Sequence, residues 1–261
     1  MSRGFGYEPG VSIIVVVFNR VDLTQKCLAS IFEHTDDPDV VVVDNGSSDA
    51  TREWLKTQPV EVVTLAENVG WGRGANAGAA VAKRDLHVHL NNDTEVRDGW
   101  LDGLLAELEP DVGAVAGRLV NPDGSLQHAG VRLFFQGSNL VAENIATEQP
   151  AGDVDCIAGT AMLVRAEAFR EAGGIDPNFR NGYEDVDFAL RLREDGWRLR
   201  FTPDSTVMHH QHGSGPERWT HVQDNVRRLN ELWAEELRSG ALHHLGAVQD
   251  VRGDRDVVDD A

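Results

Sequence analysis

A run of three polar residues, Asn91, Asn92 and Asp93, ends an apolar-leaning segment in the stretch LHVHLNNDTEV. Because side chains alternate along a strand, those of Asn91 and Asp93 can point the same way if the strand extends that far. The Asp93 carboxylate is a hard oxygen ligand of the kind that Mg²⁺ or Mn²⁺ prefers, and a diphosphate would complete such a one-carboxylate site. An Asx turn that closes the strand is the alternative interpretation.

A glycine-rich segment, ENVGWGRGANAG, lies shortly before that strand. Its glycines allow the backbone to approach a phosphate closely, and Arg73 can bind a phosphate through two parallel hydrogen bonds. The glycine spacing differs from the dinucleotide fingerprint GxGxxG, and the segment does not follow the first strand. A turn before a tightly packed helix explains the same glycines, so both interpretations stay open.

Carboxylates crowd the start of a predicted helix in NGYEDVDFALRLREDG, at Glu184, Asp185 and Asp187. The helix dipole and free N–H groups stabilise acids at this position, which is a sufficient structural explanation for any one of them. The functional hypothesis is that one carboxylate stays ionised, faces a cleft and accepts a proton from a substrate hydroxyl.

Three histidines lie close together in the segment VMHHQHGSG. His209 or His212 could complete a divalent metal site through an imidazole nitrogen, whereas surface histidines in a polar turn are the alternative. His87 and His89 alternate along a strand and are expected to be structural.

The elements that must position these side chains alternate between strand and helix over residues 11–120. Continuous β-branched runs such as VSIIVVVFN and DVVVVDN are typical of parallel strands that are covered on both faces. Polar clusters follow four of these strands, at Asn19, in DNGSSD, in ENVGWGRGANAG and in NND. Since ligands of parallel α/β sheets bind beyond the carboxyl ends of the strands, four clusters at one edge predict a single site.

The second part of the chain is less regular. We predict a turn and hairpin at 121–135, a polar loop at 136–152, a strand at 154–165, helices at 166–173 and 184–196, and a strand at 197–203. The terminal helix, 219–237, could pack on the core, form a dimer or contact a membrane. The acidic tail, 250–261, is expected to fray.

Composition narrows the function classes. Asp and Glu number 43 against 24 Lys and Arg, a formal net charge of −19, which argues against a nucleic-acid partner. Adaptation to high salt is one hypothesis for this charge, and an acidic protein from an arginine-rich proteome is the alternative. No signal peptide is visible and the longest apolar run is far shorter than the roughly 20 residues of a membrane helix. We therefore expect a cytoplasmic protein with two free thiols, and peripheral association with the cytoplasmic face of a membrane stays open.

These motifs, in this order, resemble an inverting family 2 glycosyltransferase of the rhamnosyltransferase-like branch. The motifs that carry the resemblance span roughly 11–214: VSIIVVVFNR, VVVDNGSSDAT, ENVGWGRGANAG, LNNDTEV, AGTAMLVRAEAFREAGGID, GYEDVDFALRLREDGWRL and VMHHQHGS. The resemblance implies an α/β GT-A fold over 1–215, in which 11–120 bind the nucleotide sugar and 121–215 bind the acceptor. A helical extension, 216–249, would follow.

The resemblance also implies the chemistry. A sugar would move from a nucleoside-diphosphate sugar, of the dTDP-rhamnose or UDP-sugar type, to a hydroxyl of a glycan or lipid-linked acceptor. Mg²⁺ or Mn²⁺ would assist, and the displacement would invert the anomeric carbon. A catalytically silent sugar-nucleotide-binding protein is the alternative, and a sugar-phosphate nucleotidyltransferase is disfavoured because FNRVDLTQ follows the first strand in place of its glycine-rich signature.

Residue roles follow from the same resemblance. Asp185, paired with Glu184, corresponds to the catalytic base, and Asp93 with His209 and His212 to the metal site. Asn91 replaces the first acid of the family's Asp-x-Asp motif, which should lower metal affinity. The sugar nucleotide would contact Phe18, Asn19, Asp44, Asn68, Arg73, Asn76, Asn91 and Asn92. The acceptor would contact Gly159, Thr160 and Tyr183.

Overall fold

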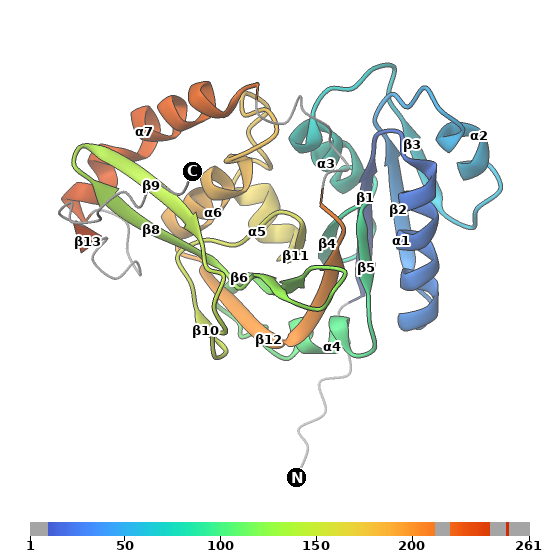
Figure 1. Cartoon of the computed structure of the whole chain (residues 1–261), viewed down its shortest axis with the longest axis horizontal. Helices are drawn as coiled ribbons and strands as arrows, with labels where there is room; N and C mark the ends of the chain where they lie inside the picture. The colour runs from blue at the N-terminus through green and yellow to red at the C-terminus, as the bar shows by residue number, and fades with distance from the viewer. Residues whose placement is uncertain (1–9, 212–219, 241–248, 251–261) are drawn as a thin grey trace, which may run out of the picture.

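A mixed, mostly parallel sheet runs through the middle of the molecule in the computed structural model, which describes residues 10–211, 220–240 and 249–250 (Figure 1). The ten-stranded sheet has the strand order β10-β12-β6-β11-β4-β1-β2-β3, with β5 and β7 added beside β12 and β6. The first four strands pair in parallel and are β1 (Val11–Val17), β2 (Asp39–Asp44), β3 (Glu61–Thr64) and β4 (Leu86–Asn91). Their carboxyl ends therefore meet at one edge, as the sequence predicts.

The remaining strands extend the sheet past β4. They are β5 (Thr94–Val96), β6 (Val112–Val120), β7 (Leu126–His128), β10 (Gly152–Asp153), β11 (Ala161–Arg165) and β12 (Arg198–His209). β11 is antiparallel to both β4 and β6, whereas β12 is parallel to β6. β12 is longer than the predicted strand 197–203, so His209 is its last residue and not part of a turn.

Helices cover both faces of the sheet. One apolar cluster includes buried side chains of α1 (Val21–His34), α2 (Thr51–Leu55) and α4 (Trp100–Leu105), and the other includes those of α3 (Trp71–Ala79), α5 (Ala166–Glu171) and α6 (Glu184–Glu194). Strand β1 contributes alternately to the two, with Ile13 in the first and Ile14 in the second. This confirms the prediction that the β-branched strands are buried on both faces.

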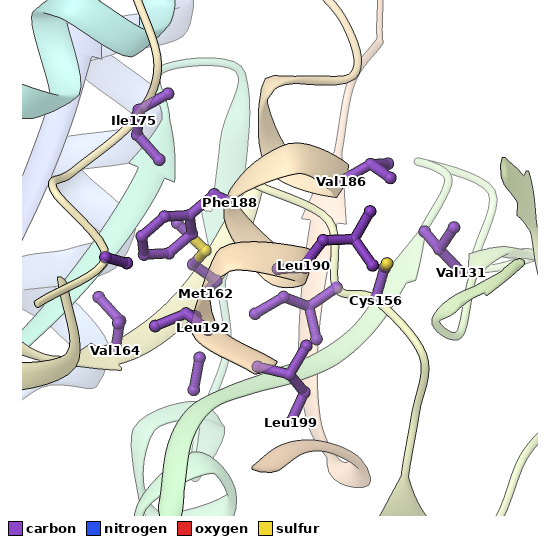
Figure 2. Packing of buried hydrophobic residues seen from close by; sticks show 14 of the residues in the cluster. Val131, Cys156, Met162, Val164, Ile175, Val186, Phe188, Leu190, Leu192 and Leu199 are labelled. Carbon is purple, nitrogen blue, oxygen red and sulfur yellow. The ribbon is translucent and has the colours of Figure 1, made fainter. Parts of the chain in front are cut away.

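The second cluster packs α6 against the sheet (Figure 2). Phe188 and Leu192 of α6 are fully buried there, together with Met162 and Val164 of β11 and Leu199 of β12. The helix that begins with the acidic pair is thus fixed by apolar contacts along its length.

The terminal helix α7 (Val222–Ser239) packs on the core, one of the three alternatives left open by the sequence. Its buried residues Leu229, Trp233 and Leu237 belong to the same cluster as α6. α7 lies beside a hairpin of β8 (Val131–Gln136) and β9 (Asn139–Asn144), on the opposite side of the molecule from α1 and α2 (Figure 1). The predicted polar loop 136–152 is therefore wrong in part, because β9 lies within it.

A short strand, β13 (Gln249–Asp250), pairs with β8 and forms a three-stranded sheet with the hairpin. The rest of the predicted tail, 251–261, lies outside the described residues. Cys27 and Cys156 are buried free thiols, as predicted. Among the described helices, none combines the length and the apolar character needed to cross a membrane.

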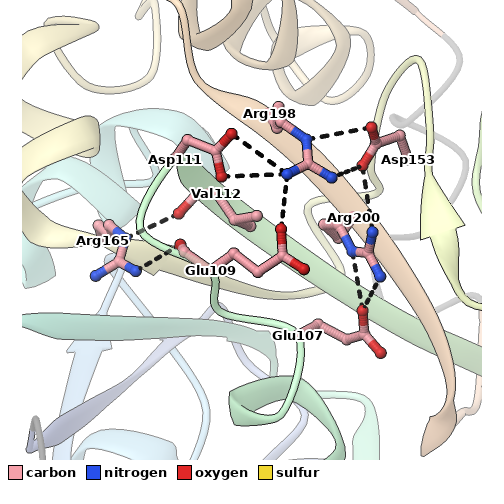
Figure 3. Close-up of polar contacts among 8 residues, drawn as sticks. All are labelled: Glu107, Glu109, Asp111, Val112, Asp153, Arg165, Arg198 and Arg200. Carbon is pink, nitrogen blue, oxygen red and sulfur yellow. Dashed lines mark hydrogen bonds and ion pairs between the residues drawn. The ribbon is translucent and has the colours of Figure 1, made fainter.

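An ion-pair network secures the start of β12, at the end of that strand remote from His209 (Figure 3). The Arg198 guanidinium lies 2.8 Å from a Glu109 oxygen, 3.1 Å from Asp111 and 2.8 Å from Asp153. Arg200 adds an ion pair with Glu107. Single exposed pairs contribute little, but a network that joins several segments restricts them together.

Candidate active site

Asp93 and His209 meet where β4 turns into β5. Asp93 lies in the two-residue turn between these strands, and β5 pairs antiparallel with β12 so that Thr94 is opposite His209. The Asp93 Oδ1 and His209 Nε2 atoms are 3.3 Å apart, and both side chains are less than a tenth exposed. The pairing of two distant strands therefore places a carboxylate beside an imidazole at the edge of the sheet.

This pair fits a divalent cation. Two ligands at right angles on one ion, each about 2.1 Å from it, lie about 3 Å apart, close to the separation seen here. A carboxylate oxygen with an imidazole nitrogen also suits Mn²⁺ or Mg²⁺ chemically. Over residues 10–211 and 220–240, no group of three or more metal-binding side chains occurs. Beyond these two ligands, phosphate oxygens, water or a side chain outside the described ranges would complete the shell of a bound ion.

The neighbouring histidine, His210, faces a different partner. Its Nε2 lies 2.5 Å from Glu95 Oε1, because adjacent residues at the end of β12 point to opposite sides. His212, the other predicted metal ligand, lies outside the described residues. The His209 ring is therefore the one beside the Asp93 carboxylate among the described histidines, whereas the His210 N–H donates to the Asp93 backbone oxygen at 2.8 Å.

Asp185 is connected to the same edge through the segment before β11. The Gly159 N–H donates to Asp185 Oδ2 at 3.0 Å, and the Val186 N–H donates to Oδ1 at 2.9 Å. The next residue, Thr160, accepts a hydrogen bond from the Asn91 N–H at 3.0 Å. A short chain of contacts thus runs from Asp185 to the end of β4, two residues before Asp93.

Only glycine fits at position 159. A Cβ atom there would lie 2.9 Å from the Trp71 ring and 3.3 Å from Asp185 Cβ. The Trp71 side chain at the start of α3 therefore closes against the segment that holds Asp185.

The loop before α6 has an unusual backbone. Asn181 and Tyr183 have φ values of 52° and 67°, in the left-handed region that non-glycine residues rarely occupy. Glu184 accepts a hydrogen bond from the Gly182 N–H and so closes this loop. Burial and, to a lesser extent, the Asp185 charge raise the pKa of Tyr183 above its ordinary value.

The predicted nucleotide-binding residues at the ends of β1 and β2 organise one loop. Asn19 Oδ1 accepts from the Ser48 N–H, and Asp44 Oδ1 accepts from the Ser47 N–H, both at 2.8 Å. Asp44 is fully buried, and its other oxygen lies 2.6 Å from Arg52 Nε. Beside this loop, the Phe18 side chain is 39% exposed.

The remaining predicted contacts of the sugar nucleotide lie around α3 and α1. Asn68 accepts from the Gly70 N–H at 3.0 Å, whereas Asn92 donates to Thr24 Oγ1 at 3.0 Å and so turns toward α1. Both polar atoms of the Asn76 amide bind the Ile175 backbone at 2.8 Å, which makes Asn76 a support for that loop. Arg73 is exposed.

Several supporting residues escaped the sequence reasoning. Asn45 donates to Asn68 Oδ1 at 3.1 Å and accepts from the Val69 N–H at 3.0 Å, so it joins the loops after β2 and β3. Its place within DNGSSD was a usable signal. Gln127 and Asn225, in contrast, bind residues far from them in the sequence, so the sequence contains no signal for these contacts.

Comparison with known proteins identifies the family. The model for glycosyl transferase family 2 matches residues 12–173. The chain is 31% identical over 227 residues to the O-antigen biosynthesis protein RfbC of Myxococcus xanthus, covering 79% of this chain but 18% of that protein. It is 27% identical over 246 residues to the N-acetylglucosaminyl-diphospho-decaprenol L-rhamnosyltransferase of Mycobacterium tuberculosis, covering 80% of this chain and 79% of that protein.

The fold agrees with this match. The structure of GalNAc-T7 with UDP, GalNAc and Mn²⁺ superposes with a TM-score of 0.70 at 19% identity, over 87% of this chain and 49% of that one. The predicted mostly parallel α/β sheet and the predicted GT-A fold are thereby confirmed. The chain belongs to glycosyl transferase family 2.

Proposed function

We propose that the chain is an inverting glycosyltransferase that moves a sugar from a nucleoside-diphosphate sugar to an acceptor hydroxyl. The observation that carries this proposal is the chain of contacts from Asp185 through Gly159 and Thr160 to Asn91, the last residue of β4, two residues before Asp93. This arrangement supports Asp185 as a proton acceptor and Asp93 with His209 as metal ligands at one edge of the sheet.

Asp185 is the proposed base. Two N–H donors and the start of α6 favour its charged carboxylate, which is the form that can accept a proton from a substrate hydroxyl. Glu184 is the weaker candidate because its side chain is 7% exposed and accepts from the Gly182 N–H. In this role Asp185 takes the proton of the acceptor hydroxyl as that oxygen attacks the anomeric carbon.

Asp93 and His209 would hold the divalent cation, for which His212 remains a further proposed ligand. When bound, Mg²⁺ or Mn²⁺ supplies positive charge to the leaving diphosphate. The Mn²⁺ and UDP in the GalNAc-T7 structure support this assignment. Asn91 in place of an acid leaves one carboxylate in the turn, so the donor diphosphate would have to contribute oxygens to the ion.

The donor and acceptor are assigned by class. The nucleotide of a dTDP- or UDP-sugar is proposed to bind the residues around the ends of β1, β2 and β3. These residues are Phe18, Asn19, Asp44, Asn68 and Arg73. Gly159, Thr160 and Tyr183 border Asp185 and are proposed to bind the acceptor. A lipid-linked glycan acceptor is supported by the name of the mycobacterial relative, which gives a diphospho-decaprenol acceptor. We propose that the chain meets such an acceptor at the cytoplasmic face of a membrane.

Replacement of Asp185 by Asn tests the proposal. We expect this variant to lose transfer while it still binds UDP or dTDP in the presence of Mn²⁺, because the amide cannot accept the hydroxyl proton. Asp195→Asn, at the exposed end of the same helix, is the matched control and should transfer normally. Near-normal turnover of Asp185→Asn would remove that residue from its role.

Asp93→Ala probes the metal separately. It should weaken nucleotide binding that depends on Mn²⁺ and leave metal-independent binding unchanged. Wild-type protein that binds donors but neither transfers nor hydrolyses any of them would favour the catalytically silent binding protein.

A further inference from the structure

Gln127, on the short strand β7, makes three contacts beside the Asp93–His209 pair. Its Nε2 donates to the His209 backbone oxygen at 3.2 Å and to Asn121 Oδ1 at 2.9 Å. Its Oε1 lies 2.7 Å from His209 Nδ1. One side chain therefore holds both the backbone and the ring of the histidine.

The orientation of this amide follows from its partners. A backbone oxygen can only accept, so the nitrogen of the Gln127 amide must face His209 O. The oxygen Oε1 is then left to face Nδ1, where it accepts a hydrogen bond from Nδ1–H. In a neutral imidazole with hydrogen on Nδ1, the lone pair is on Nε2, and Nε2 is the atom 3.3 Å from Asp93 Oδ1.

We propose that Gln127 is a positioning residue that fixes the tautomer and ring orientation of His209, so that Nε2 is available to a divalent cation together with Asp93. This inference rests on the proposed function, which places the cation there. The His209 Nε2 and Asp93 Oδ1 atoms, 3.3 Å apart, are at a separation that suits two ligands of one cation. A partner on the second nitrogen of a metal-binding histidine fixes its tautomer and ring orientation in metalloproteins generally.

Two substitutions separate the chemistry of Gln127 from its shape. Gln127→Met keeps the length of the side chain but removes the oxygen that accepts from Nδ1–H. Gln127→Glu loses the two hydrogen bonds that the amide nitrogen donates but keeps an oxygen that accepts from Nδ1–H, so it should keep the tautomer. Gln136→Met makes the same change at an exposed glutamine at the end of β8 and serves as the matched control.

The first measurement needs no metal. Nitrogen-15 shifts of histidine side chains at pH 8 report which ring nitrogen carries hydrogen. We expect His209 to carry it on Nδ1 in wild type, Gln127→Glu and the control, and to become a mixture of tautomers in Gln127→Met. The inference would be overturned if His209 in the wild type carried hydrogen on Nε2, either on that nitrogen alone or on both ring nitrogens. An unchanged tautomer in Gln127→Met would also overturn it.

The second measurement titrates Mn²⁺ alone, followed by electron paramagnetic resonance of the free ion. The apparent dissociation constant should rise about tenfold in Gln127→Met, the lower end of effects seen for such supporting residues, and should not rise in Gln127→Glu. If Asp93→Ala abolished Mn²⁺ binding but Gln127→Met left it intact, the role of Gln127 would be refuted and the proposed metal site would stand. Wild-type binding that Asp93→Ala leaves unchanged would refute the proposed metal site, and the inference with it.

Discussion

Asn225, on the terminal helix α7, binds the loop that precedes Asp185. Asn225 is 3% exposed, and its Nδ2 donates to the backbone oxygens of Arg180 and Gly182, both at 2.8 Å. Its Oδ1 accepts from the Arg180 N–H at 3.4 Å. Because two residues of the 181–183 segment have left-handed backbones, this loop depends on outside contacts to keep its conformation.

Asn225→Ala removes these contacts without adding bulk. Each of the two short hydrogen bonds is worth about 1 kcal/mol net, and the longer third adds less, so the loop should lose about 2 kcal/mol. Since about 1.4 kcal/mol corresponds to a factor of ten in population, the ordered loop would be disfavoured by about 30-fold. We therefore expect kcat to fall by up to about 30-fold, with little change in Mn²⁺-dependent binding of UDP or dTDP.

Asn230→Ala is the matched control for this prediction. Asn230 lies on the same helix, and its amide also binds backbone groups, at 2.6 Å and 3.2 Å to Leu140 and at 2.9 Å to Val226. Both variants should lose similar thermal stability, but only Asn225→Ala should speed amide hydrogen exchange at 180–186 and lower kcat. Equal kcat values in the two variants would refute the reasoning, because stability alone would then explain both.

Two further predictions concern the buried surroundings of the site. Gly159→Ala should lower both kcat and the free energy of unfolding, the latter by about 1–3 kcal/mol, because its Cβ would lie 2.9 Å from the Trp71 ring; Gly152→Ala, whose Cβ meets nothing within 4 Å, should do neither. Burial, with a smaller effect of His87, lowers the pKa of His89 to about 3. The unfolded chain therefore binds the extra proton below about pH 6.5, and His89 alone lowers stability by about 1.4 kcal/mol per pH unit between there and pH 3. Burial also lowers the pKa values of His87 and His128, so their contributions add to this slope. His89→Leu should reduce the slope of stability against pH in urea unfolding by about this amount across that range, and an undiminished slope would contradict the assignment.

The edge of the sheet was predictable from the sequence because its signals are local. Buried β-branched strands end abruptly in polar residues, and parallel pairing brings their carboxyl ends together. Asp93 could thus be assigned to this edge from its own segment. The acidic start of α6 was also visible, because carboxylates and a following apolar periodicity share one short stretch.

The contacts that hold the site together were not predictable in this way. The Gln127–His209 contact and the Asn225–Gly182 contact join residues separated by 82 and 43 positions, and a lone amide gives no periodic pattern. The hairpin strand β9 was missed because polar residues flank its short apolar run, Leu140 to Ala142, and because Leu140 is its one buried residue. One of its two edges is paired, to β8. Strand β12 was cut short because the bulge near Thr202 interrupts the pattern before His209.

Charge at this edge makes the cation central to the proposed reaction. With a net charge of −19, the protein as a whole repels an anionic nucleotide sugar. The nearby arginines offset this only weakly: Arg20 lies 3.0 Å from Asp22, and Arg52 lies 2.6 Å from the buried Asp44. Their charges are thus largely compensated, whereas Arg73 makes no ion pair with any described residue. One exposed guanidinium cannot balance a diphosphate, so the ion proposed at Asp93 and His209 must both attract the donor and stabilise its leaving group.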